Sequence, residues 1–228
     1  MDVRIECQPS YAMAYLSLDV GESALVEHGA MAAMSAGISV GVGIGPGGIA
    51  KAVLRKTLGG ESFFMGRYTA DLHGAWVAVS PKFPGDITLV HVTPGHSYAF
   101  EAGAFLAASE GVDVDVKYTG VRTVLLREGV TMLGVRGTGK ALICSYGGIQ
   151  SFDLPDGATM IVDTGHLVGF AETVTVKIGP LSSLTTAMVT GEGLVAELTG
   201  PGEVFVQTRA EQQLQAWLLP DKQQNSRR

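Results

Sequence analysis

The sequence carries the same pattern three times, and this internal repeat constrains the fold more than any single motif. Segments 21–40, 95–114 and 157–176 align without a gap. Each begins with glycine, has a hydroxyl residue two positions later, places an acidic residue two positions before a second glycine, and ends in alternating apolar residues. The matching positions are Gly21, Gly95 and Gly157; Ser23, Ser97 and Thr159; Glu27, Glu101 and Asp163; and Gly29, Gly103 and Gly165. The pattern predicts one structural unit used three times.

A second block alternates with the first. Each copy has a Glu-Gly or Glu-Ser pair, then a glycine followed by a mostly apolar run; the pairs begin at Glu61, Glu128 and Glu192, and the glycines are Gly74, Gly139 and Gly202. The units therefore span about 1–80, 85–145 and 147–209. Because a unit of ~60 residues buries too little apolar surface to be stable alone, we expect residues 1–210 to form one domain in which the units share a core with pseudo-threefold symmetry.

Short strands separated by turns account for most of the chain. Apolar and polar residues alternate in segments 87–92, 112–118 and 173–178, as they do in half-buried strands. Glycine supplies 31 of the 228 residues, and it recurs with proline in turn sequences at 84–86, 93–95, 155–157 and 200–202. This spacing predicts an antiparallel, all-β chain.

Two segments depart from the strand pattern. A short helix is predicted at 49–59, where apolar and basic residues are spaced for one face each and glycine lies near both ends. It is inserted in the first unit and has no counterpart in the others. The C-terminal tail, 211–228, is polar except for a patch around Trp217, which predicts a short docked segment followed by disorder.

Charge and cysteine content restrict the class of partner. The net charge is −6 with only 16 Lys and Arg residues, and these are scattered, so nucleic acid is an unlikely partner. Cys7 and Cys144 lie far apart and form no metal-ligand motif. Together with an N-terminal segment that carries charges and no apolar core, they indicate free thiols, no signal peptide and a cytoplasmic location.

An uncharged stretch, 29–50, is the segment to test for contact with a membrane. It is rich in glycine and contains no leucine, so it is a poor membrane-spanning helix. Its second part, the Gly-rich loop 37–50, combines apolar residues with basic neighbours, which suits an anionic headgroup layer or a partner surface. The candidate contact residues are Ile44, Pro46, Ile49, Lys51 and Arg55.

Motifs for catalysis, metals and cofactors are weak. Gly43 to Gly48 satisfies G-x-G-x-x-G, but a dinucleotide site needs a parallel β-α-β unit, and the following sequence reads as antiparallel strands. The five histidines show no metal-ligand spacing, and no G-x-S-x-G motif occurs. We therefore predict no enzyme, no cofactor and no metal site; the carboxylates Glu27, Glu101 and Asp163 are expected to cap turns in their own units.

Several ordered motifs resemble one known family. They are Gly21-Glu-Ser, His28-Gly-Ala-Met, Gly60-Glu-Ser-Phe-Phe, Gly103-Ala-Phe-Leu-Ala, Glu128-Gly, Val162-Asp-Thr-Gly-His-Leu-Val and the run from Gly200 to Arg209. Residues 11–209 are similar to the bacterial branch of the altered-inheritance-of-mitochondria (mitochondrial biogenesis) family. The resemblance implies a fold like that of the tryptophan RNA-binding attenuation protein, a short antiparallel double-stranded β-helix or sandwich, here in three tandem copies. Mitochondrial relatives are associated with inner-membrane organisation, and no catalytic residues are implied.

The function predicted from these features is that of a non-catalytic scaffold or interaction protein. Open sheets of short strands must protect their edges, and pairing with another copy does so, so we expect a homo-oligomer, a trimer, with a protein partner that the sequence leaves unknown. Two alternatives remain: binding to a membrane surface through loop 37–50, and binding of a small apolar ligand in a β-barrel-like pocket.

Overall fold

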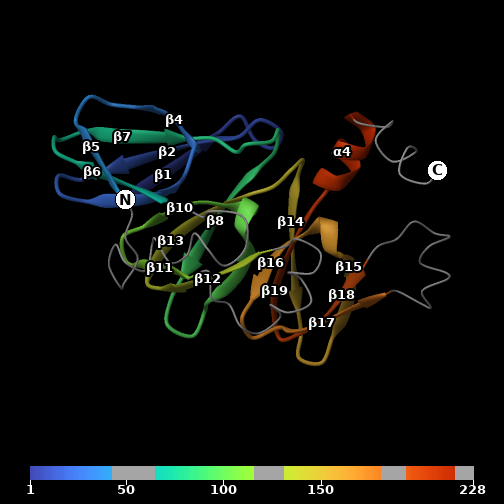
Figure 1. The fold of residues 1–228 in the computed structure, drawn as a ribbon. Helices are drawn as coiled ribbons and strands as arrows, with labels where there is room; N and C mark the ends of the chain where they lie inside the picture. Colours follow the sequence, from blue (N-terminus) through green and yellow to red (C-terminus); the bar gives the residue numbers. More distant parts are fainter. Residues whose placement is uncertain (43–64, 116–130, 181–193, 219–228) are drawn as a thin grey trace.

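The fold is all-β, as the sequence predicts. The computed structural model describes residues 1–42, 65–115, 131–180 and 194–218, which form nineteen β-strands, two short 3-10 helices and one α-helix (Figure 1). Every pairing between these strands is antiparallel.

After an initial strand, β1 (Asp2–Glu6), six strands recur in the same order in each unit. The first unit contains β2 (Met13–Leu18), β3 (Ser23–Glu27), β4 (Met31–Met34), β5 (Ile38–Val42), β6 (Met65–Ala70) and β7 (Ala75–Val79). The second contains β8 (Ile87–Val92), β9 (Tyr98–Glu101), β10 (Phe105–Ser109), β11 (Val112–Asp115), β12 (Met132–Gly137) and β13 (Gly139–Cys144). The third contains β14 (Ile149–Leu154), β15 (Thr159–Asp163), β16 (Leu167–Ala171), β17 (Thr175–Pro180), β18 (Leu194–Thr199) and β19 (Gly202–Gln207).

The local sequence explains these strands and their turns. In β2 every second residue, Ala14, Leu16 and Leu18, is buried while the residues between them are more exposed, as the alternation predicts. The glycine that opens each first block has a positive φ, +83° at Gly21, +88° at Gly95 and +74° at Gly157. Residues that carry a side chain rarely adopt a positive φ, so the turn at this position explains why glycine recurs there.

Each unit forms two three-stranded groups with the same pairing. The first groups are β2-β7-β4, β8-β13-β10 and β14-β19-β16, and the second groups are β5-β6-β3, β11-β12-β9 and β17-β18-β15. Pairing of β3 with β10, and of β9 with β16, joins the second group of one unit to the first group of the next. The result is a series of four sheets with four, six, six and three strands. The pseudo-threefold axis itself stays a prediction.

Three apolar clusters hold the sheets together. The first contains residues of β2, β3 and β7 such as Leu16, the second is centred on Phe100, Phe105 and Phe205, and the third contains Phe170. In the second cluster, the rings of Phe100 and Phe205 are 5.5 Å apart between centroids and tilted by 59°, a favourable aromatic geometry. The predicted shared core is thus divided into successive clusters between the sheets.

The helix that the structure describes is α4 (Glu211–Leu218), in the C-terminal tail. The predicted helix at 49–59 and the predicted disorder at the end of the tail fall on residues 43–64 and 219–228, outside the described ranges. Short 3-10 helices, η2 (Ala102–Ala104) and η4 (Thr164–His166), link the second strand to the third strand in the second and third units. None of the helices in the described ranges has the length and apolarity needed to cross a membrane.

Candidate functional site

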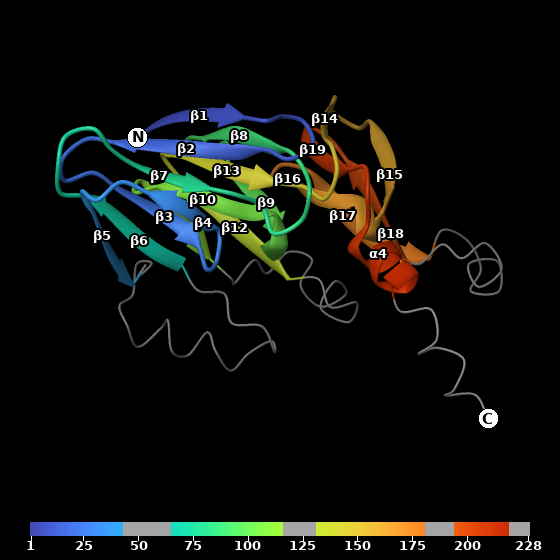
Figure 2. The ribbon, with the colours of Figure 1, turned by 90° about the horizontal axis from the view of Figure 1, so that it is seen from above.

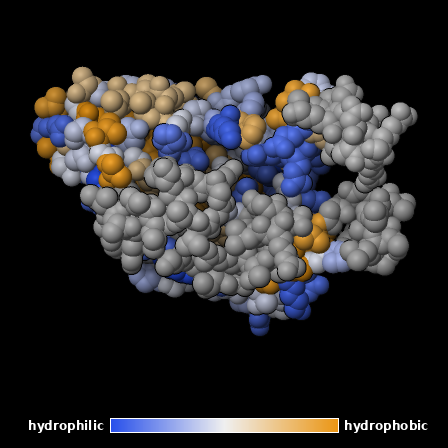
Figure 3. All heavy atoms as spheres, in the orientation of Figure 1, coloured by the Kyte–Doolittle hydropathy of each residue, from blue (hydrophilic) through white to orange (hydrophobic). Residues whose placement is uncertain are grey.

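The structure does not test the contact residues predicted from the Gly-rich loop. Ile44, Pro46, Ile49, Lys51 and Arg55 all lie between 43 and 64, outside the described residues, as does the G-x-G-x-x-G motif. The first part of the predicted loop is not a loop, because residues 38–42 form the strand β5. Its residues Val40 and Val42 are 54% and 67% exposed. Figure 3 shows apolar residues gathered at the end of the molecule where β4 and β5 lie.

The repeated carboxylates have different local roles. Asp163 accepts a hydrogen bond of 2.8 Å from the backbone N–H of Gly165 at the start of η4, which is the turn capping that the sequence predicts. At the equivalent position of the first unit, burial raises the pKa of Glu27 from 4.5 to about 7, although the positive charge of Lys82 opposes the change. The same repeat position is therefore a cap in one unit and a partly buried acid in another.

The thiols and imidazoles do not gather into a metal-binding group in the described part of the chain. Both cysteines are free, as predicted; Cys7 is exposed and Cys144 is buried. Burial is the main cause that raises the pKa of the Cys144 thiol, which therefore stays protonated. His166 contacts the carbonyl oxygen of Gln207 through Nδ1 at 2.8 Å. Among the described residues, no three His, Cys, Asp or Glu side chains are placed to hold a metal ion.

Two open sheet edges form the first candidate interaction site. β4 ends the first sheet and β15 ends the last, and the two strands lie apart in both views (Figures 1 and 2). Their counterparts in the other units are not edges: β10 and β16, the counterparts of β4, pair with β3 and β9, the counterparts of β15. The described chain therefore forms the same strand-to-strand junction twice, between consecutive units. At its two ends, β4 and β15 present the two halves of this junction without a partner strand among the described residues.

Apolar residues on the two open edges are more exposed than the residues at the same repeat positions on paired strands. Ile161 of β15 is 55% exposed, whereas the residues at the same repeat position, Leu25 and Ala99, are 4% and 0% exposed. Met34 of β4 is 39% exposed, and the residue at its position in the second unit, Ala108, is fully buried. Exposed apolar residues and unpaired backbone groups together give such an edge the capacity to pair with another strand.

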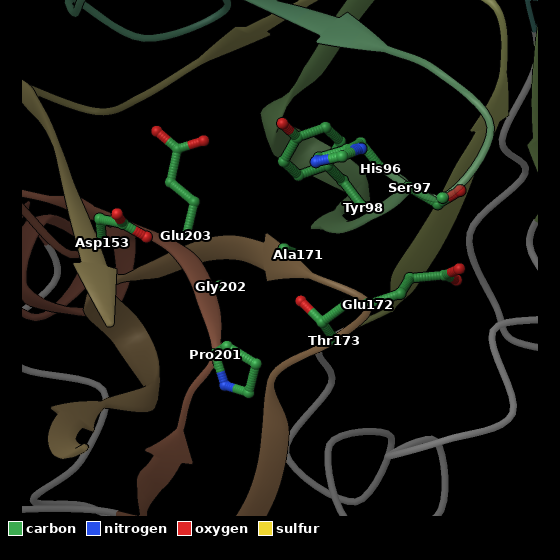
Figure 4. A pocket seen from close by; sticks show the side chains of 11 residues that line it. His96, Ser97, Tyr98, Asp153, Ala171, Glu172, Thr173, Pro201, Gly202 and Glu203 are labelled. Atoms are coloured by element: carbon green, nitrogen blue, oxygen red, sulfur yellow. The ribbon is translucent and has the colours of Figure 1, made fainter. Parts of the chain in front are cut away.

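A polar cleft between the second and third units is the second candidate site. It has a volume of about 660 Å³ and is lined by the turn before β9, the end of β16 and neighbouring parts of β14 and β19. Asp153 and Glu203 lie on one side, and His96 and Tyr98 lie on the other (Figure 4). Glu172 belongs to the lining as well, and it pairs with the guanidinium group of Arg136.

The electrostatics of the cleft follow from its unbalanced carboxylates. Burial raises the pKa of Glu203; a hydrogen bond with Ser151 opposes this change, and the negative charge of Asp153 adds to it. Burial and the charge of Glu203 also raise the pKa of Tyr98. Among the described residues, neither Asp153 nor Glu203 forms an ion pair. The cleft therefore favours a positively charged occupant.

Almost the whole described chain matches one family model. Residues 3–209 fit the model described as Mitochondrial biogenesis AIM24. The chain belongs to this family. The match agrees in family and in extent with the resemblance carried by the ordered motifs.

The AIM24 chain is also similar to streptococcal proteins. An uncharacterized protein of Streptococcus pyogenes serotype M6 is 26% identical over 215 residues, which cover 91% of this chain and 86% of the relative. The crystal structure of a Streptococcus pyogenes protein superposes with a TM-score of 0.75 at 24% identity, and the match covers 96% of this chain and 98% of that chain. The second likeness shows that the two proteins share a fold.

Sequence reasoning on this AIM24 chain missed the cleft. A signal was present, because the aligned second blocks change from Lys140 to Glu203 directly after the repeated glycine. In the first strand of each of these two units, His91 of the second unit is likewise replaced by Asp153 in the third. These substitutions become meaningful only when the fold shows that both positions face one turn of the preceding unit.

Proposed function

We propose that this AIM24 protein is a non-catalytic scaffold that assembles into a homotrimer by pairing β15 of one copy with β4 of the next. The single observation that carries the proposal is the exposure of the two edges whose counterparts are paired inside the chain. Other edge strands, such as β5, β11 and β17, occupy an edge in every unit, so they are not missing a partner that the repeat supplies elsewhere.

The register of the inner junctions predicts the contact between copies. Ala107 pairs with Val26 where β10 meets β3. The same repeat positions on the open edges are Ala33 and Val162, so the residue types at the two ends already match an existing pair. The neighbouring position would bring Met34 of one copy beside Ile161 of the next, which would bury both exposed side chains.

The chemistry of the two edges also favours a closed assembly. The surfaces on β4 and β15 differ, so the contact is heterologous, and repeated heterologous contacts either close into a ring or continue as a filament. A ring leaves no copy with an open end. In a closed trimer, β4 and β15 of every copy are paired with a strand of a neighbouring copy. The exposed apolar residues on these strands are then buried without any additional partner.

The mass of the assembly in solution tests the proposal. We expect light scattering at micromolar concentration to give three times the chain mass of 23.8 kDa, and Ile161→Asp to give a folded monomer because it places a charge at the centre of the contact. Thr175→Asp is the matched control, since Thr175 is exposed on β17 at the opposite edge of the same sheet. It should leave the trimer intact. A sharp monomer mass for the unmodified protein would overturn the proposal.

A further inference from the structure

The position of the polar cleft has an equivalent between the first and second units, defined by the aligned residues of the repeat. Both lie where the turn before one unit's second strand faces the first three-stranded group of the next unit. Their lining differs in charge. The aligned residues, with the counterpart named first, are Glu22 and His96, His91 and Asp153, Glu110 and Glu172, and Lys140 and Glu203.

The protein's own chain occupies the equivalent position between the first and second units. The amino nitrogen of Met1 pairs with the carboxylate of Glu22, and the side chain of Met1 is only 1% exposed. The ammonium group of Lys140 donates a hydrogen bond of 3.1 Å to the carbonyl oxygen of Met1. A main-chain segment therefore occupies this position, held by one acidic and one basic side chain from two different units.

The strand β1 carries Met1 into that position. β1 pairs along the whole of β2, with Asp2 opposite Ser17, and Figure 2 shows it beside β2 and β8. The strands that correspond to β2 in the other units, β8 and β14, are the last strands of their sheets. Within the described residues no strand lies on β8 as β1 lies on β2, so the cleft between the second and third units lacks a segment like the one at the equivalent position.

The change in lining determines which segment would fit. Where the equivalent position has a lysine to hold a carbonyl oxygen, the cleft between the second and third units has Glu203, and Asp153 stands beside it in place of His91. Glu172 is neutralised by Arg136, so Asp153 and Glu203 remain as the carboxylates to be balanced. A lysine or arginine on the entering segment balances them, and its aliphatic stem can lie along the wall that contains Tyr98.

We propose that the cleft between the second and third units binds an extended basic segment of a partner protein, in the place that Met1 and β1 take between the first and second units. The volume of about 660 Å³ accommodates several side chains and is of the size of organic ligand sites. A bare metal ion does not suit it, because no three metal-ligating side chains converge in the described part of the protein.

Binding of a defined peptide to the full-length protein tests the inference. The probe is a fluorescently labelled hexapeptide of alternating lysine and valine, about the length of a β-strand, followed by fluorescence anisotropy. We expect it to bind, and the corresponding glutamate–valine peptide not to bind. Glu203→Lys should weaken binding by about tenfold or more, because it replaces an attraction by a like-charge contact.

The matched control is Glu197→Lys, which makes the same charge change on β18 at a carboxylate that pairs with Lys177 and is not part of the cleft lining. It should leave the affinity within about twofold, since a distant exposed charge is screened by salt. Equal weakening by both variants, no binding of the lysine–valine peptide, or displacement of the peptide by spermidine at equal concentration would each overturn the inference. The masses of Glu203→Lys and Glu197→Lys are measured in parallel, because Glu197 pairs opposite Ile161 of the proposed contact. Loss of peptide binding and loss of the trimer are thereby distinguished for both variants.

Discussion

The inner junctions between units and the open ends of the molecule use equivalent strands but differ in burial. At the junction of β3 with β10, Leu25 is 4% exposed and lies in the second apolar cluster. At the same repeat position on β15, Ile161 is 55% exposed. Both residues are large and apolar, so the side chain does not explain the difference. The neighbouring strands explain it, because β3 pairs with a strand on each side, whereas the described chain supplies β15 with β18 on one side and with no strand on the other.

The largest effect should come from placing a charge at the inner junction. Leu25→Asp removes the leucine contacts, which alone costs about 2–5 kcal/mol, and it also leaves a carboxylate in an apolar cluster. We expect no cooperative thermal unfolding transition, or one lowered by more than about 10 °C. The same change at Ile161 should alter the mass of the assembly and leave the fold of the chain intact. Similar losses of stability at the two positions would remove the distinction between inner and open edges.

A smaller effect should come from adding a Cβ atom at Gly169, where β16 pairs with β9. A Cβ atom there would lie 2.2 Å from Cδ1 of Phe100 and 2.5 Å from the carbonyl oxygen of Ala99. The pair Gly169 and Phe100 occupies the register of Ala107 and Val26 at the other inner junction, so the larger ring is matched by the smaller residue. Gly169→Ala should destabilise the protein by about 1–3 kcal/mol through overpacking.

The double variant Gly169→Ala with Phe100→Val sharpens this test, because it recreates the residue sizes of the first junction. Its loss of stability in urea denaturation should be smaller than the sum of the two single losses, as expected for residues in contact. Additive losses would show that the two junctions are not packed in the same way. Ala33→Gly on the open edge of β4 serves as a comparison in the isolated chain and should cost about 1 kcal/mol or less.

The smallest effect concerns the acidic residue that ends β3 and the equivalent residue that ends β15. Because burial raises the pKa of Glu27 on β3 to about 7, the folded state holds this proton more tightly than the unfolded state, whose pKa is near 4.5. Stability should therefore fall as the pH rises from about 4.5 to about 7 and stay constant above that range.

Glu27→Gln should remove this pH dependence and stabilise the protein by about 1 kcal/mol or less at pH 8, since Glu27 is still partly in contact with solvent. Asp163→Asn on β15 is the comparison, and it should retain most of the stability because asparagine can also cap the turn. The free energies of unfolding of the three proteins, measured between pH 4.5 and 8, check the prediction. An unchanged slope in Glu27→Gln would contradict it.

Much of the fold was accessible from the alignment of the units. The recurrence of glycine at Gly21, Gly95 and Gly157 is visible in the sequence, and all three have positive φ. The alternating segment 87–92 coincides with β8, residues 112–115 and 175–178 of the other two lie in β11 and β17, and Asp163 caps a turn as predicted. These features depend on near neighbours in the chain, whose geometry is fixed by backbone sterics and by the period of a strand.

The candidate sites were less accessible, for two different reasons. The sequence drew attention to loop 37–50 because it occurs once, whereas the cleft is built from residues on four separate segments that become neighbours only after the sheets form. Nothing local in Asp153 or Glu203 distinguishes a cleft carboxylate from a solvated one. The open edges were expected in general terms, but the identity of β4 and β15 required the pairing order of the strands.

The sequence by itself determined the repeated unit, the all-β class and the positions of the turns, because each of these follows from interactions within about ten residues. Only the tertiary structure decided that the junction between units is made twice inside the chain, that Met1 lies between Glu22 and Lys140, and that a cleft lies beside Glu203. The physical reason is that the stability of a strand edge and the energetic cost of a buried carboxylate both depend on the neighbouring groups. Those neighbours are set by the pairing of segments that are distant in the sequence.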